Sequence, residues 1–106
     1  MTNDTFVTLC KRIVCDYANQ HLDRTDNRMI STGNVYVVWL SKTLQNNKAL
    51  LSTVLPDGMY YEITYNGDKN EIYFDAYKKF ENRCINPETL QIVTQNDASF
   101  DKKERT

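Results

Sequence analysis

The sequence predicts an α+β fold, in which one N-terminal helix packs on an antiparallel meander of about four strands. Apolar residues recur at helical spacing before residue 23, without an intervening glycine or proline. Four later runs, between Val35 and Phe80, are rich in valine, isoleucine, threonine and aromatic residues. Short turn segments separate these runs, and short connections favour antiparallel neighbours. We therefore expect residues 1–94 to form a single α+β domain.

The predicted helix extends from about Asp4 to about Leu22. Thr2, Asn3 or Asp4 can cap its N-terminus, and Asp4 also suits the positive end of a helix. The apolar residues on one side should pack on the sheet, and they are Phe6, Leu9, Cys10, Ile13, Val14, Tyr17 and His21. Residues 23–34 are polar and predict a loop, with Met29 and Ile30 tucked inward.

The four predicted strands are Val35–Leu44, Lys48–Leu55, Met59–Tyr65 and Glu71–Phe80. The turn signals between them are Gln45–Asn47, Pro56–Gly58 and Asn66–Asn70. Alternation places Met59, Tyr61, Ile63 and Tyr65 on one face of the third strand. The matching face of the fourth has Ile72, Phe74, Ala76 and Phe80. These apolar sets should face the helix. We expect Trp39, Ile63 and Phe74 to be buried, with Ile13 packing from the helix.

The first predicted strand is apolar on both sides. Strict alternation places Val35, Val37 and Trp39 on one side and Tyr36, Val38 and Leu40 on the other. A strand with two apolar faces is usually covered on both, yet the first strand of a plain meander is an edge. Either the C-terminal segment covers this strand, or the strand order is permuted, or a second chain covers it, as in a homodimer.

The C-terminal segment is less regular. Leu90, Ile92 and Val93 could add a short strand or dock on the sheet, beyond the interruption at Pro87. Residues 95–106 are polar and charged, and are predicted to be a disordered tail.

Composition argues against several classes of function. The chain has 13 Lys plus Arg against 14 Asp plus Glu, so it lacks the basic surplus of proteins that bind nucleic acid or anionic membranes directly. No segment has the pattern of a signal peptide or the length of a transmembrane helix. Cys10, Cys15 and Cys84 lack metal-ligand spacing, and His21 is the only histidine. We expect a cytoplasmic protein with reduced thiols and without a metal or cofactor.

One group of residues on the outer sheet face has a candidate function. Pairing the third and fourth strands across an Asp68–Lys69 turn places Glu62 opposite Asp75, Tyr60 opposite Tyr77 and Thr64 opposite Tyr73. Carboxylates directly opposite each other are destabilising. Lys42, Lys48 or Lys79 could neutralise them on a solvated face, or the two acids could act as a catalytic pair. We favour a partner-binding surface, since tyrosine is enriched at interfaces; its residues are Tyr60, Glu62, Tyr73, Asp75 and Tyr77.

The segments VYVVW, SKTLQNNKALLST, DGMYYEITYNGDK and EIYFDAYKKFEN resemble a family of small uncharacterised proteins encoded by temperate phages and prophages of Gram-positive bacteria. KTLQNNKALLST and YNGDK are the most specific of these motifs, and the tail after Cys84 departs from the family pattern. The resemblance implies an intracellular phage setting and transfers no catalytic residue.

We therefore expect a non-enzymatic phage protein that inhibits or modulates a host protein. By analogy, the target could be a nucleic-acid-processing defence effector, as with anti-CRISPR inhibitors. The alternatives are an accessory protein in replication or gene regulation, and a small hydrolase that uses the acidic pair Glu62 and Asp75.

Overall fold

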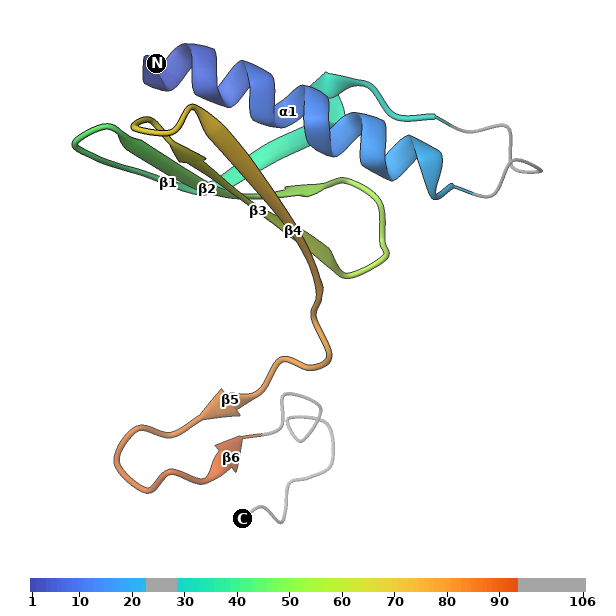
Figure 1. The fold of residues 1–106 in the computed structure, drawn as a ribbon. Helices are drawn as coiled ribbons and strands as arrows, with labels where there is room; N and C mark the ends of the chain where they lie inside the picture. The colour runs from blue at the N-terminus through green and yellow to red at the C-terminus, as the bar shows by residue number, and fades with distance from the viewer. Residues whose placement is uncertain (23–28, 94–106) are drawn as a thin grey trace.

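The computed structural model describes residues 1–22 and 29–93. A helix, α1 (Asn3–Gln20), covers one face of a four-stranded antiparallel sheet, as the sequence predicts (Figure 1). The strands are β1 (Val35–Thr43), β2 (Asn46–Thr53), β3 (Met59–Asn66) and β4 (Glu71–Lys78), in the order β1-β2-β3-β4. The predicted tail at 95–106 and the first half of the predicted loop at 23–34 lie outside the described residues.

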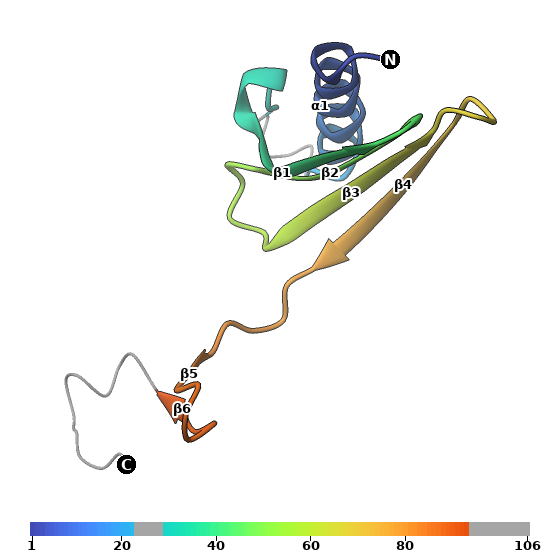
Figure 2. The same ribbon diagram turned by 90° about the vertical axis from the view of Figure 1, so that its left-hand side faces the viewer.

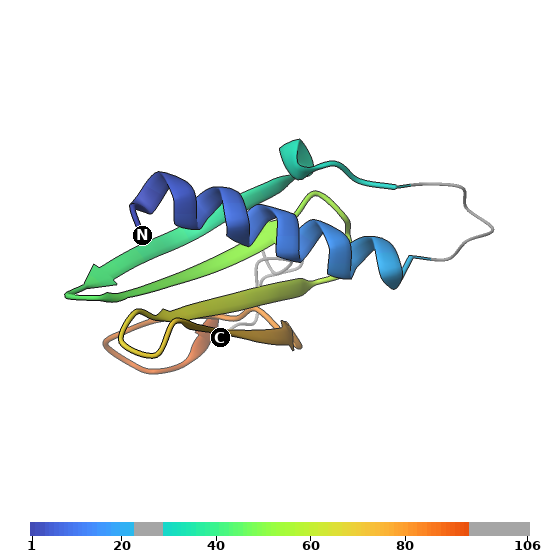
Figure 3. The same cartoon turned by 45° about the horizontal axis from the view of Figure 1, so that its top comes forward.

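The helix begins where its polar N-terminal residues can cap it. Of the expected caps, Thr2 is the N-cap, and its hydroxyl accepts a hydrogen bond from the Thr5 backbone N–H at 3.1 Å. Near the C-terminal end of the helix, Tyr17 lies against the sheet, and its ring centroid is 5.0 Å from that of Phe74. The helix packs mainly on β1 and β2, so β4 lies at the less covered margin of the sheet (Figure 3).

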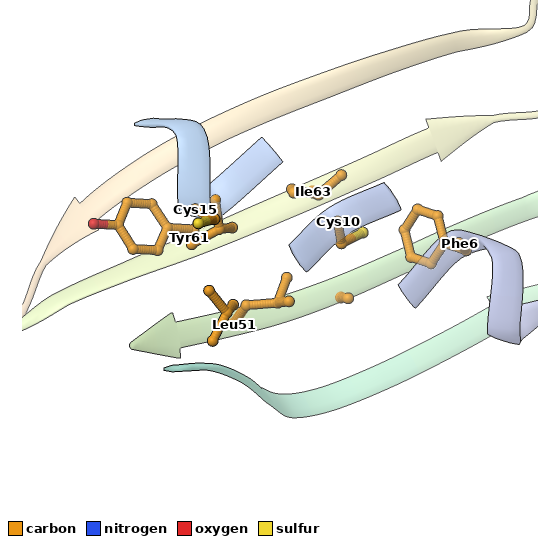
Figure 4. Close-up of a cluster of buried hydrophobic side chains, with 9 residues drawn as sticks. Phe6, Cys10, Cys15, Leu51, Tyr61 and Ile63 are labelled. Carbon is orange, nitrogen blue, oxygen red and sulfur yellow. The ribbon is translucent and has the colours of Figure 1, made fainter. Parts of the chain in front are cut away.

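A small core fills the space between α1 and the sheet (Figure 4). Its buried side chains are Phe6, Cys10, Val14, Cys15, Val35, Ala49, Leu51, Tyr61 and Ile63. Ile63 is buried as predicted, and Ile13 and Phe74 are partly buried and pack against this cluster. Ile30 also packs inward as predicted, whereas Met29 is exposed, contrary to expectation.

The prediction that Trp39 is buried is wrong. The pairing of β1 with β2 shifts between Val37 and Trp39, so that Val37 lies opposite Leu51 and Trp39 opposite Leu50. Val38 is the extra residue of a β-bulge, and a bulge reverses the alternation of every residue that follows it. Trp39 therefore lies on the outer face, and Leu40 lies on the helix side.

The first hairpin turns earlier than its asparagines suggest. Leu44, with a φ of 55°, occupies the turn, and β2 already begins at Asn46. Asn47 is buried under the start of the helix, where its amide donates to Asn3 Oδ1 at 3.2 Å. The turn of this hairpin passes close to Gly67. A Cβ at position 67 would lie 2.2 Å from the Gln45 carbonyl oxygen, so only glycine fits there.

The described part of the C-terminal segment does not extend the sheet, and Phe80, which was expected to face the helix, lies beyond the end of β4 and is exposed. Within the described residues, β5 (Cys84–Ile85) pairs with β6 (Ile92–Val93) in a separate two-stranded hairpin. This hairpin lies on the side of the sheet opposite α1 and apart from it (Figure 2). The strand order is also not permuted, so β1 is an edge. Among residues 1–22 and 29–93, neither a C-terminal strand nor a permuted strand order covers β1.

Candidate partner-binding surface

The outer face of the sheet brings the five predicted residues together. The pairing of β3 with β4 matches the predicted register, with Tyr60 opposite Tyr77, Glu62 opposite Asp75 and Thr64 opposite Tyr73. Tyr73 and Tyr77 are 49% and 52% exposed, and Asp75 is also exposed. Tyr60 and Glu62 are half-buried. The like-charged neighbours inferred from the sequence are therefore a feature of the fold.

The same face includes aromatic residues that sequence reasoning missed. Trp39 is 41% exposed and lies in one cross-strand row with Leu50, Glu62 and Asp75. Tyr36, at 47% exposure, lies on the same face of β1, opposite Ser52. Strict alternation places Tyr36 on its observed side of β1 but assigns Trp39 and Leu40 to the wrong sides, because these two residues follow the bulge. We refer below to Tyr36, Trp39, Tyr60, Glu62, Tyr73, Asp75 and Tyr77 as the outer-face surface.

The two opposed carboxylates have different surroundings. Glu62 Oε2 lies 3.6 Å from Lys48 Nζ, so one of the three lysines proposed from the sequence does neutralise an acid. Lys42 instead donates to the Met1 carbonyl oxygen, and Lys79 lies over the Tyr60 ring, 5.8 Å from its centroid. Among the ion pairs of the described residues, none includes Asp75.

Neighbouring acids raise the pKa of two tyrosines of this surface. The negative charge of Asp75, followed by desolvation and the charge of Glu62, raises the pKa of Tyr77. A hydrogen bond to the Glu71 carboxylate raises the pKa of Tyr73. Both hydroxyls are protonated at neutral pH, and that of Tyr73 already donates to the Glu71 carboxylate. A hollow of about 330 Å³ borders the surface between Lys48, Thr64 and Tyr73.

The nucleophile and base candidates lie elsewhere. His21 stacks on Tyr17 at the end of α1, and its Nδ1 donates to the Tyr17 carbonyl oxygen at 2.8 Å. It lines a hollow of about 240 Å³ with Asp57 and Tyr61, whose hydroxyl has a pKa raised to about 12, mainly by burial. Cys10 is buried on the helix side, and burial raises its thiol pKa to about 12.

The described residues, 1–22 and 29–93, do not form a metal-binding site of clustered ligands. No group of three histidine, cysteine or acidic side chains lies close enough there to hold a metal ion. Cys15 donates its thiol hydrogen to the Ile30 carbonyl oxygen, and Cys84 is exposed. The described part of the chain also has no helix that could cross a membrane.

The fold and this surface define a small α+β domain with an exposed face of aromatic and acidic residues. The chain belongs to the family of unknown function DUF6275, whose pattern matches residues 7–87. This match covers α1 from Val7 onward, the whole four-stranded sheet and β5. No curated protein and no solved structure shows significant similarity to the chain.

Proposed function

We propose that the protein is a non-enzymatic binding protein whose outer-face surface binds a partner protein. The observation that carries the proposal is the exposure of four aromatic side chains, Tyr36, Trp39, Tyr73 and Tyr77, on the sheet face opposite the helix. Tyrosine and tryptophan provide large contact areas at a small cost in side-chain entropy, and both are enriched at protein interfaces.

The charges of the surface indicate the chemistry of the partner. Glu62 is paired with Lys48, whereas Asp75 lies opposite Glu62 and is exposed. A basic patch on a partner would relieve the repulsion between these two acids. Asp75 is thus the acid that we expect to contribute most to electrostatic attraction. This chemistry fits a host protein that handles nucleic acid, because such proteins expose basic patches.

The biological setting in this proposal is that of a phage protein in the host cytoplasm. It follows from the resemblance of the strand motifs to proteins of temperate phages, and it makes inhibition of a host defence effector the leading role. A role in phage replication or gene regulation would use the same surface to join a complex. The hydrolase alternative has less support, since His21 and Cys10 lie away from Glu62 and Asp75.

The experiment is an affinity capture from host lysate with matched variants. Trp39→Ala and Tyr77→Ala remove exposed rings from the surface, and Val54→Ala removes an exposed apolar side chain from the β2–β3 loop as a control. We expect one host protein to be retained by the wild type and the control and lost with both surface variants. Equal capture by all four proteins would refute binding through this face.

A second measurement tests the electrostatic part of the proposal with the captured partner. Asp75→Asn should slow association and flatten its dependence on salt, because exposed interface charges act mainly on the association rate. Glu62→Gln should have a smaller effect, since Lys48 already neutralises this acid. If the association rate of Asp75→Asn equals that of the wild type at low salt, Asp75 does not take part in binding.

A further inference from the structure

β4 is one edge of the sheet, and a single hydrogen bond shows which of its backbone groups have no partner in β3. The Lys79 N–H donates to the Gly58 carbonyl oxygen at 2.8 Å, directly beyond the Met59–Lys78 pair. Hydrogen-bonded and non-hydrogen-bonded pairs alternate along an antiparallel ladder. The odd-numbered residues of β4 therefore bond to β3. The backbone N–H and C=O groups of Ile72, Phe74 and Ala76 point to the free edge.

This edge has few of the features that protect edge strands from pairing. The other edge, β1, is interrupted by the bulge at Val38. In contrast, β4 pairs with β3 along its full length without a register shift. On the helix side, Ile72 and Phe74 are half-buried and Ala76 is exposed, because α1 packs mainly on β1 and β2 (Figure 3).

We propose that β4 pairs antiparallel with β4 of a second copy, about a twofold axis at Phe74, to form one continuous sheet. Residues opposite each other must lie on the same face, so the axis passes through a residue. With the axis at Phe74, about six backbone hydrogen bonds form through the residues whose groups point outward. The Phe74 side chains of the two copies meet on the helix side, and each Ile72 faces the other copy's Ala76.

The charges and the strand length favour this register over its neighbours. On the outer face, Tyr73 of one copy lies opposite Asp75 of the other and Glu71 opposite Tyr77, so no two carboxylates of β4 face each other across the boundary. An axis at Asp75 would place two carboxylates directly opposite each other, which is destabilising. An axis at Ala76 would leave Ile72 without a partner residue in β4, because β4 ends at Lys78.

The pairing would place two outer-face surfaces side by side, with Asp75 near the boundary between the copies. The partner-binding surface of the assembly would then be twofold symmetric and about twice as large. The pairing itself uses backbone groups of the edge, so it does not depend on whether that surface binds a partner.

Sedimentation equilibrium of the full chain over a range of concentrations tests the pairing. Ala76→Pro removes an N–H that points to the free edge and leaves the bonds to β3 in place. Ala76→Ser keeps the N–H and is the matched control. We expect dimers for the wild type and Ala76→Ser, and a monomer with an unchanged circular dichroism spectrum for Ala76→Pro. A wild type that remains monomeric at hundreds of micromolar would overturn the proposal.

A charge swap tests the register and does not depend on proline. In the dimer, Tyr73→Asp would create two symmetry-related contacts in which the new carboxylate lies opposite Asp75 of the other copy. This repulsion should raise the dimer dissociation constant about tenfold. Tyr73→Lys would face the same carboxylate with opposite charge and should keep or lower that constant. With an axis at Ala76, Tyr73 would instead face Lys79, and the two variants would act in the reverse order. That reverse order, or equal dissociation constants, would overturn the register.

Discussion

Replacing Asp75 with asparagine should stabilise the protein. Asp75 lies directly opposite Glu62 on the outer face, and among the described residues it has no ion-pair partner. Like charges at opposed positions of an antiparallel pair cost about 0.2–1 kcal/mol. Asparagine keeps the shape and removes the charge, so the free energy of unfolding should rise by about that amount. For a domain of this size, the midpoint of thermal unfolding should rise by about 1–6 °C.

Glu62→Gln should behave differently because Glu62 takes part in two opposing interactions. Its repulsion from Asp75 is removed, but so is its ion pair with Lys48, at 3.6 Å with partly exposed side chains. An exposed ion pair contributes about 0.2–1 kcal/mol, which is close to the repulsion that is lost. The free energy of unfolding should therefore change little. In the double variant with Asp75→Asn, the stabilisation from Asp75→Asn should disappear, since the repulsion is already absent.

Urea unfolding at pH 7 and fixed protein concentration measures these changes, and spectrophotometric titration of tyrosine provides an independent readout. The charge of Asp75 is the largest cause of the raised pKa of Tyr77, so Asp75→Asn should lower that pKa toward its ordinary value. Glu62→Gln should lower it less. A loss of stability in Asp75→Asn would mean that Asp75 makes a favourable contact, and the reasoning from opposed charges would be wrong.

Three further predictions concern the core and its titrating groups. Ile63→Ala should lower the free energy of unfolding by about 3 kcal/mol, because Ile63 is fully buried. Phe74→Ala, at a half-buried site, should lower it by about 2 kcal/mol. Equal urea midpoints for the wild type and Ile63→Ala would contradict the assignment of Ile63 to the core. In the folded protein, a thiol reagent should modify Cys84 rapidly and the buried Cys10 and Cys15 slowly, with all three reacting in urea. Burial raises the pKa of Tyr61 from 10.0 and of Cys10 from 9.0, in each case to about 12, so the native state holds protons that the unfolded state releases. This stability is present below about pH 9 and should be lost between pH 9 and 12, which thermal unfolding across that range can measure; an unchanged midpoint would contradict it.

The sequence was sufficient to predict β3, β4 and their register. Both strands alternate regularly, and the short turn after Asn66 favours the pairing that places Ile63 directly opposite Phe74. Once that register was set, the opposition of Glu62 and Asp75 followed without further information. The helix was predicted for similar reasons, since its apolar side has one clear spacing and Thr2 was among the expected caps.

The faces of β1 could not be predicted in the same way. Every residue from Val35 to Leu40 is apolar or aromatic, so the sequence pattern is compatible with a bulge at several positions. What decides its position is the pairing with β2, where Leu51 and Ala49 must both face the helix. The turn before β2 was misplaced for a related reason. Asn47 has the composition of a turn residue but lies buried, because its side chain reaches Asn3 at the start of the helix.

The bulge connects this difficulty to the candidate function. Without the extra residue Val38, Trp39 would point toward the helix, and the outer face would lose its largest aromatic side chain. With it, the outer face presents exposed rings on β1 and β4, at both edges of the sheet, on either side of the row that contains Glu62 and Asp75. Bulges occur often where a side chain is redirected to a binding site and a strand edge is protected. In this fold one residue does both, since it turns Trp39 outward and leaves β4 as the uninterrupted edge for a second copy.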